Sequence, residues 1–160
     1  MERSDLITTA TQLKPVSWTS VEEFSSKREA LVALINQKME NRHDLIDMVG
    51  AGNVDMMKDN HANHARFMES IFAQHSPEVL VDTILWVFRA YRSRNFSSTY
   101  WAAQLNAWIE IYKKELSPAC FKEIYPFYNW MQINIPAFNR LAEEKLEAPF
   151  SSHQHSEETN

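Results

Sequence analysis

The chain has 160 residues, of which 44% are hydrophobic, and it carries a formal net charge of −5 with only two glycines and one cysteine. This length suits one domain with its own core. The acidic balance argues against a nucleic-acid-binding surface, and the lone Cys120 excludes an internal disulfide framework or a cysteine-based zinc site. Since no apolar run is long enough to cross a membrane, we expect a cytoplasmic protein without a membrane anchor.

The N-terminal part predicts a flexible arm followed by one long helix. Residues 1–16 have little hydrophobic periodicity, so we expect them to form the arm. The stretch from Ser20 to Glu23 has the pattern of a capping box, in which a serine and a glutamate three residues later satisfy backbone N–H groups. The helix that starts there should continue to Val49, where the glycines at 50 and 52 end it.

Four more helices are predicted after this loop, at about 54–74, 76–91, 99–116 and 117–138. Serine followed by proline marks the start of two of them, at Ser76 and Ser117. Pro126 and Pro136 predict kinks or a break in the last one. Residues 149–160 are polar, so a disordered tail is expected. The predicted fold class is all-α, a single domain over 17–148 with five to six helices, globin-like or an irregular bundle.

Three histidines fall on the apolar side of the helix predicted at 54–75. His61, His64 and His75 share that arc with Met68. Neutral imidazole is a common ligand of transition metals and haem iron, and residues three apart on a helix are neighbours, so His61 and His64 are the candidate metal ligands. Three interpretations stay open: hydrogen-bonded core residues, the wall of a pocket for a polar ligand, or ligands of a metal or haem.

Five further residues are candidates for the wall of the same pocket: Arg42, Arg89, Trp101, Gln104 and Trp108. Each combines a polar group with a position on an apolar helix face, where long stems also extend along the core and amides need partners. The helix at 76–91 is apolar nearly all round, which predicts that a homodimer contact covers it. The sequence contains no HExxH and no GxSxG motif, so we name no catalytic residue and expect no enzymatic activity.

The segment LVDTILWVFRAYRSRNFSSTYW (residues 80–101), with the SPACF at 117–121 after the next helix, resembles a helical module of bacterial signalling proteins. Such modules precede cobalamin-binding, STAS or kinase domains, and in stressosome proteins some are globin-like without haem. Asn95 stands where that pattern has a glycine. The resemblance implies a sensory or regulatory helical domain.

Together these patterns predict a non-enzymatic sensory domain that binds a small ligand in an interior pocket and signals through dimer or partner contacts. The alternative is a protein that uses His61 and His64 to bind haem or a transition metal for oxygen or redox chemistry. A third hypothesis is a purely structural interaction protein whose histidines are satisfied core residues. A signalling protein is the expected partner beside a second copy of the chain.

Overall fold

Eight α-helices make up the part of the chain that this computed structural model describes, residues 1–147, with side chains described through Glu144. They span Arg3–Ala10 (α1), Trp18–Glu40 (α2), Leu45–Val49 (α3), Val54–Ala73 (α4), Pro77–Arg92 (α5), Thr99–Glu115 (α6), Pro118–Ile133 (α7) and Ile135–Glu147 (α8). These residues contain no strand, so the prediction of a single all-α domain is confirmed. The tail predicted at 149–160 lies outside the described residues.

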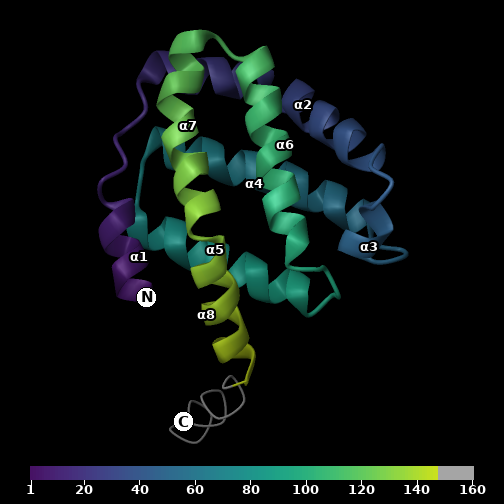
Figure 1. Cartoon of the computed structure of the whole chain (residues 1–160). Coiled ribbons are helices and arrows are strands. Elements are labelled where there is room, and N and C mark those ends of the chain that lie inside the picture. Colours follow the sequence, from purple (N-terminus) through teal and green to yellow (C-terminus); the bar gives the residue numbers. More distant parts are fainter. Residues whose placement is uncertain (148–160) are drawn as a thin grey trace, which may run out of the picture.

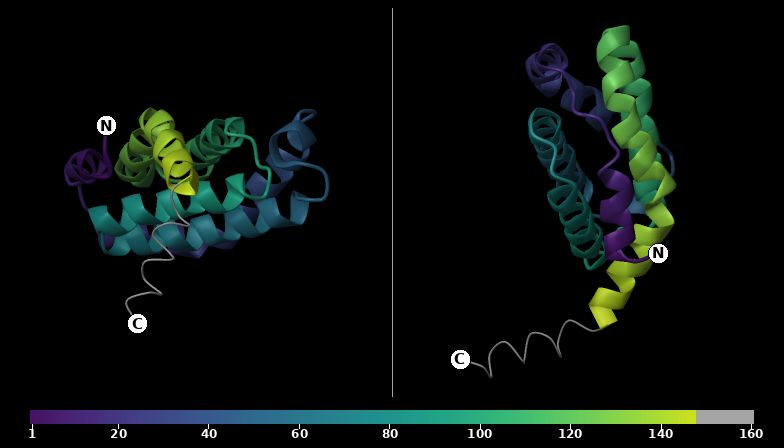
Figure 2. Two further views of the ribbon diagram at one scale, coloured as in Figure 1. Left: turned by 90° about the horizontal axis from the view of Figure 1, so that it is seen from below. Right: turned by 90° about the vertical axis from the view of Figure 1, so that its left-hand side faces the viewer.

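The helices form two layers that cross each other steeply. Helices α2, α4 and α5 lie side by side in one layer, and α6, α7 and α8 run across them in the other (Figure 1). The layers are seen edge-on in Figure 2, with α1 and α3 at opposite margins. Aromatic side chains fill the space between them, as where Phe24 meets Phe72 and Tyr112 edge to face. No helix in the described part is both long and apolar enough to span a membrane.

The N-terminal residues form a helix where the sequence predicted a flexible arm. Helix α1 packs against α5, with Leu6 and Ala10 fully buried. Trp130 Nε1 donates to Thr9 Oγ1 at 2.9 Å, and Arg3 pairs with an aspartate of α5 at 2.6 Å. Because only two of the eight residues of α1 are buried, its sequence lacks the amphipathic period by which helices are found.

The long helix predicted from Ser20 to Val49 is two helices with a turn between them. Helix α2 begins earlier, after Ser17, whose hydroxyl accepts from the backbone N–H of Ser20 at 3.3 Å. It ends at Glu40, and the four residues of the turn contain neither glycine nor proline. Gly50, at φ 89°, then ends α3 as predicted, because this left-handed conformation favours glycine.

Both predicted serine–proline helix starts are confirmed. The hydroxyls of Ser76 and Ser117 accept from the backbone N–H groups three residues later, at the starts of α5 and α7. The start of α7 is also bonded to α2. Ser117 donates its backbone N–H and its hydroxyl to the carboxylate of Glu23, both at 2.7 Å. Burial raises the pKa of Glu23, but the bonds from Ser117 and Lys27 outweigh it, so this pKa is lowered.

The last predicted helix is also divided, at Asn134. Its side chain donates to the carbonyl of Trp130 at 2.8 Å, and its own carbonyl accepts from Phe138, so it ends α7 and begins α8. Pro136 falls in the first turn of α8, where no backbone donor is needed. Pro126 remains inside α7 without ending it. The described chain therefore has eight helices where five to six were predicted.

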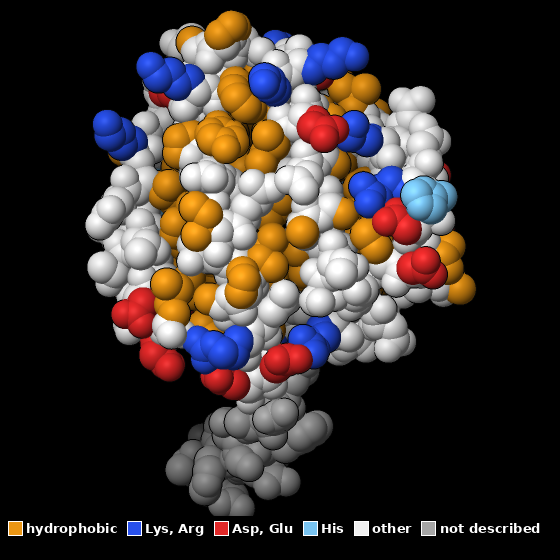
Figure 3. Space-filling view, viewed as in Figure 1, with side chains coloured by type: hydrophobic (Ala, Val, Ile, Leu, Met, Phe, Trp, Pro, Cys, Tyr) orange, Lys and Arg blue, Asp and Glu red, His pale blue; other side chains and the backbone are white. Residues whose placement is uncertain are grey.

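Hydrophobic side chains also reach the surface of the second layer. Figure 3 shows them in a band over α6, α7 and α8, with most of the charged side chains around its margin. Ile133 is 67% exposed and Tyr125 is 38% exposed on α7. Some charged side chains form ion pairs, such as Lys38 with Glu110 at 2.7 Å and Arg92 with Glu143.

Candidate functional site

A cavity of about 240 Å³ separates α4 from α5, and we call it the α4–α5 cavity. Its floor comes from α6, α7 and α8. The lining residues are Asn60, Asn63, His64, Phe67, Met68, Thr83, Ile84, Trp86, Val87, Phe88, Tyr91, Trp101, Gln104, Leu105, Met131 and Phe138. Asn63 and Trp86, the latter 64% exposed, mark its mouth between α4 and α5. The ring of Phe88 stacks on that of Trp101, with centroids 4.5 Å apart, and forms a flat apolar wall.

A buried network of hydrogen bonds surrounds His61 behind the cavity. His61 Nδ1 lies 2.7 Å from Asn36 Oδ1, and Nε2 lies 3.1 Å from the hydroxyl of Tyr100. The same hydroxyl donates to Asn60 Oδ1 at 2.8 Å, and Gln104 Nε2 donates to that oxygen at 2.7 Å. The network joins α2, α4 and α6, and both ring nitrogens of His61 are engaged in it. A buried imidazole is stable when its polar atoms are satisfied in this way.

His64 heads a second chain of hydrogen bonds, which links α4 to α6 through α7. Its Nε2 lies 2.7 Å from the hydroxyl of Tyr128, which lies 2.6 Å from the hydroxyl of Tyr112. The His64 ring also stacks on Trp108, with centroids 5.2 Å apart. His64 is only partly buried, and it lines the α4–α5 cavity. This histidine therefore connects the core to the cavity.

Both histidines are neutral at pH 7. Desolvation, with a smaller contribution from the neighbouring His64, lowers the pKa of His61 to about 3. Desolvation alone lowers the pKa of His64 to about 3. His64 lines the cavity and is only partly buried. Its ring is desolvated because it lies deep in the protein, although protein atoms do not cover it completely. Burial likewise raises the pKa of Tyr100 well above its ordinary value, so the phenol stays protonated.

Four of the residues predicted for the pocket line the cavity together: His64, Met68, Trp101 and Gln104. His61 and Trp108 form the next layer behind this wall, where Trp108 is fully buried and its Nε1 has no hydrogen-bond partner among the described residues. These six residues therefore belong to one site.

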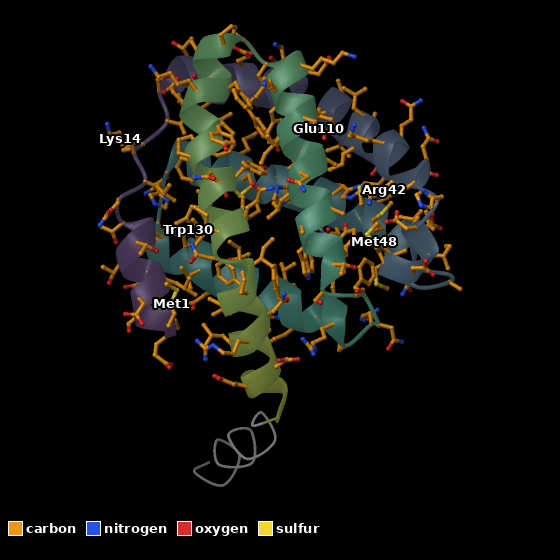
Figure 4. All side chains as sticks on the ribbon, in the orientation of Figure 1. Met1, Lys14, Arg42, Met48, Glu110 and Trp130 are labelled. Atoms are coloured by element: carbon orange, nitrogen blue, oxygen red, sulfur yellow. The ribbon has the colours of Figure 1, made fainter. Side chains whose placement is uncertain are left out.

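The other three predicted residues lie elsewhere. Arg42 is exposed and bonds Asp44 at 2.9 Å, in the turn after α2 (Figure 4). His75 follows the end of α4, and its Nε2 lies 2.9 Å from the carbonyl of Ala10. Arg89 is not one of the lining residues of the cavity, and burial lowers its pKa. The predicted positions of Arg42 and His75 on an apolar helix face do not apply, because both residues lie beyond the ends of their helices.

The hydrogen-bonded geometry does not fit a metal centre. A metal at His61 would have to replace a hydrogen-bond partner, since both ring nitrogens are engaged, and at His64 the bond to Tyr128 already engages Nε2. Among the residues described, no group of three or more histidines, cysteines, aspartates and glutamates is placed to hold an ion. The arrangement favours hydrogen-bonded histidines at the edge of a ligand cavity.

The sequence did not single out Asn60, Tyr100, Tyr112 or Tyr128, although these residues orient both histidines. A signal was present: buried tyrosine hydroxyls need partners, and Tyr100 precedes Gln104 by one helical turn. The pairing across α4, α6 and α7 depends on how the layers cross, which a single sequence does not reveal.

No protein-family model matches this chain, and no curated protein or solved structure shows significant similarity to it. The interpretation of the site therefore depends on its own geometry.

Proposed function

We propose that this chain is a cytoplasmic, non-enzymatic sensory domain that binds a small, mostly apolar molecule in the α4–α5 cavity. The observation that carries the proposal is the cavity itself, which lies between two consecutive helices and has a mostly apolar lining with a few polar side chains, His64 and Gln104 among them. Protein interiors are otherwise close-packed, and apolar pockets with a few convergent polar groups are the usual form of small-molecule sites. At about 240 Å³ the cavity is smaller than the ~300–1,000 Å³ of typical drug-sized sites, so the ligand should be compact.

Signalling would depend on α5. This helix packs against α1 and α8 but makes few backbone contacts with α4. A ligand that fits better when α5 is displaced would select that arrangement from the ensemble. The exposed Trp86 and Val79 of α5 offer a contact for a second copy or for a signalling partner. The resemblance of residues 80–130 to helical sensory modules, some of them globin-like, supports the same role.

Toluene is the probe for the first test, since an apolar cavity of this kind accepts small aromatic molecules. Thermal unfolding followed with increasing toluene should show a saturable rise in Tm, because a ligand that binds only the folded state stabilises it. Ile84→Trp places a larger side chain in the cavity and should abolish the rise. Val79→Trp, on the exposed side of the same helix, is the matched control and should keep it.

Equal toluene responses in the wild type and in Ile84→Trp would contradict the proposal, as would no saturable response in the wild type. Near-stoichiometric iron or zinc in the purified protein would instead favour the haem or metal alternative. The dimer is tested separately by light scattering across a dilution series. Trp86→Ala should shift the protein toward monomer.

A further inference from the structure

The cavity wall contains no charged side chain. Among its sixteen described lining residues there is no aspartate, glutamate, lysine or arginine. The polar groups are three amides, one hydroxyl of threonine, one of tyrosine, the indole N–H groups of Trp86 and Trp101, and the imidazole of His64, which is neutral at pH 7. A carboxylate or an ammonium group that entered would lose water without gaining a countercharge, and such burial is strongly unfavourable.

The hydroxyl chain behind His64 fixes the proton on its ring. The buried hydroxyl of Tyr112 has Tyr128 as its sole hydrogen-bond partner among the described residues, so its proton is donated there. The proton of Tyr128 is then donated to His64 Nε2. Because a neutral imidazole carries one N–H, that proton lies on Nδ1. No described residue accepts from Nδ1, so the cavity wall offers a free donor.

A free acceptor lies beside this donor. Gln104 uses its Nε2 to donate to Asn60 Oδ1, and its Oε1 makes no hydrogen bond to any described residue. Asn60 precedes His64 by one turn of α4, so Gln104 and His64 border the same end of the cavity. Gln104 is 1% exposed and is thereby held in place. His64 Nδ1 thus offers a hydrogen-bond donor, and Gln104 Oε1 offers an acceptor. Both side chains are uncharged, so they match an uncharged head group that accepts one hydrogen bond and donates one.

We propose that the α4–α5 cavity selects a compact apolar molecule with an uncharged polar end, such as a primary amide or a hydroxyl, and rejects carboxylates and amines of the same size. The carbonyl or hydroxyl oxygen would accept from His64 Nδ1, and the N–H or O–H would donate to Gln104 Oε1. The apolar body would lie against Phe88 and Trp101. This inference rests on the proposed function of the cavity and adds the class of its ligand.

The test compares three six-carbon probes that differ only at the polar end: hexanamide, hexanoate and hexylamine. Titrations at pH 7 are followed by backbone amide chemical shifts of the full chain, with toluene as the apolar reference. We expect saturable binding of hexanamide, and binding of hexanoate and of hexylamine weaker by about a hundredfold or more. Hexanoate has nearly the shape of hexanamide, so that difference reports the added charge together with the loss of the N–H that donates to Gln104 Oε1.

Two variants separate recognition from folding. Gln104→Leu should weaken hexanamide binding about tenfold more than it weakens toluene binding, the order expected for one hydrogen-bonding group. Tyr128→Phe removes the hydroxyl that fixes the His64 tautomer. Nitrogen NMR of the imidazole should show Nδ1 protonated in the wild type and a mixture of tautomers in this variant.

Hexanoate that binds as tightly as hexanamide would overturn the inference, as would toluene binding without any hexanamide binding. Either result would leave the proposed function standing. Failure of both toluene and hexanamide to bind would overturn the proposed function itself. A wild-type His64 with its proton on Nε2 would also overturn the inference, independently of any ligand.

Discussion

Acidification should destabilise this domain at a pH well above that at which its carboxylates titrate. The folded-state pKa of His61 and of His64 is about 3, against 6.5 for an ordinary histidine. The unfolded chain therefore takes up protons at these two positions below pH 6.5, while the folded chain does not. The stability contributed by the neutral rings is fully present above that pH and is lost progressively toward pH 3.

The size of this loss follows from the difference in proton uptake. Each histidine costs about 1.36 kcal/mol per pH unit in this window, so at pH 5 each has cost about 2 kcal/mol and the pair about 4 kcal/mol. Domains have total stabilities of about 5–15 kcal/mol, so this is a large fraction. The lowered pKa of Glu23 and of Glu123 adds a loss of the same sign, but mostly below pH 5.

Urea unfolding at pH 7, 6.5, 6, 5.5 and 5 measures the effect, with helicity as the signal. We expect the free energy of unfolding to fall with a slope approaching 2.7 kcal/mol per pH unit by pH 5, and to be nearly constant above pH 7. His61→Gln removes one titrating ring and should halve the slope, whatever it does to the stability at pH 7. A wild-type slope near zero between pH 6 and pH 5, or one that His61→Gln leaves unchanged, would refute the reasoning.

Four further substitutions test the described contacts by the same unfolding measurement. Tyr128→Phe should cost about 2–3 kcal/mol because it leaves partners unsatisfied on both sides, whereas Tyr112→Phe should cost about 1 kcal/mol; equal costs would contradict the described order of the hydroxyl chain. Asn95 has φ 73°, so Asn95→Gly should be neutral or stabilising by up to about 1 kcal/mol, and a clear loss of stability would count against this backbone conformation. Ser117→Ala should cost about 1 kcal/mol by removing the cap of α7, and no change would show that Glu23 alone holds this helix start.

The parts of the fold that were predictable are those with a local cause. Ser76 and Ser117 predict helix starts, because helix capping and the fixed φ of the following proline both act within a few residues. The turn after Glu40 has no such signal, since polar residues there are as compatible with a continuing helix as with its end. Helix α1 was missed because it is stabilised by contacts with α5 and Trp130, which are distant in the sequence.

The candidate site also has features with a local cause, which were predictable, and features that depend on residues distant in the sequence, which were not. The inward direction of His61 and of His64 follows from the helical period alone, and the structure has both facing α6. What each histidine does there depends on Tyr100 and Tyr128, 39 and 64 residues further along the chain. The cavity was not predictable, because an absence of packing between α4 and α5 leaves no pattern in either helix.

The break between α7 and α8 at Asn134 lies in the floor of the cavity. Met131, in the last turn of α7, and Phe138, in the first turns of α8, line the same cavity from opposite sides of this residue. Helix α7 packs on α6, whereas α8 packs on α5. If the cavity widened between Met131 and Phe138, the angle between α7 and α8 would change, and α5 would move with the helix on which it packs. The width of the cavity would then set the angle between α7 and α8. A distance measured between probes on these two helices would report that angle.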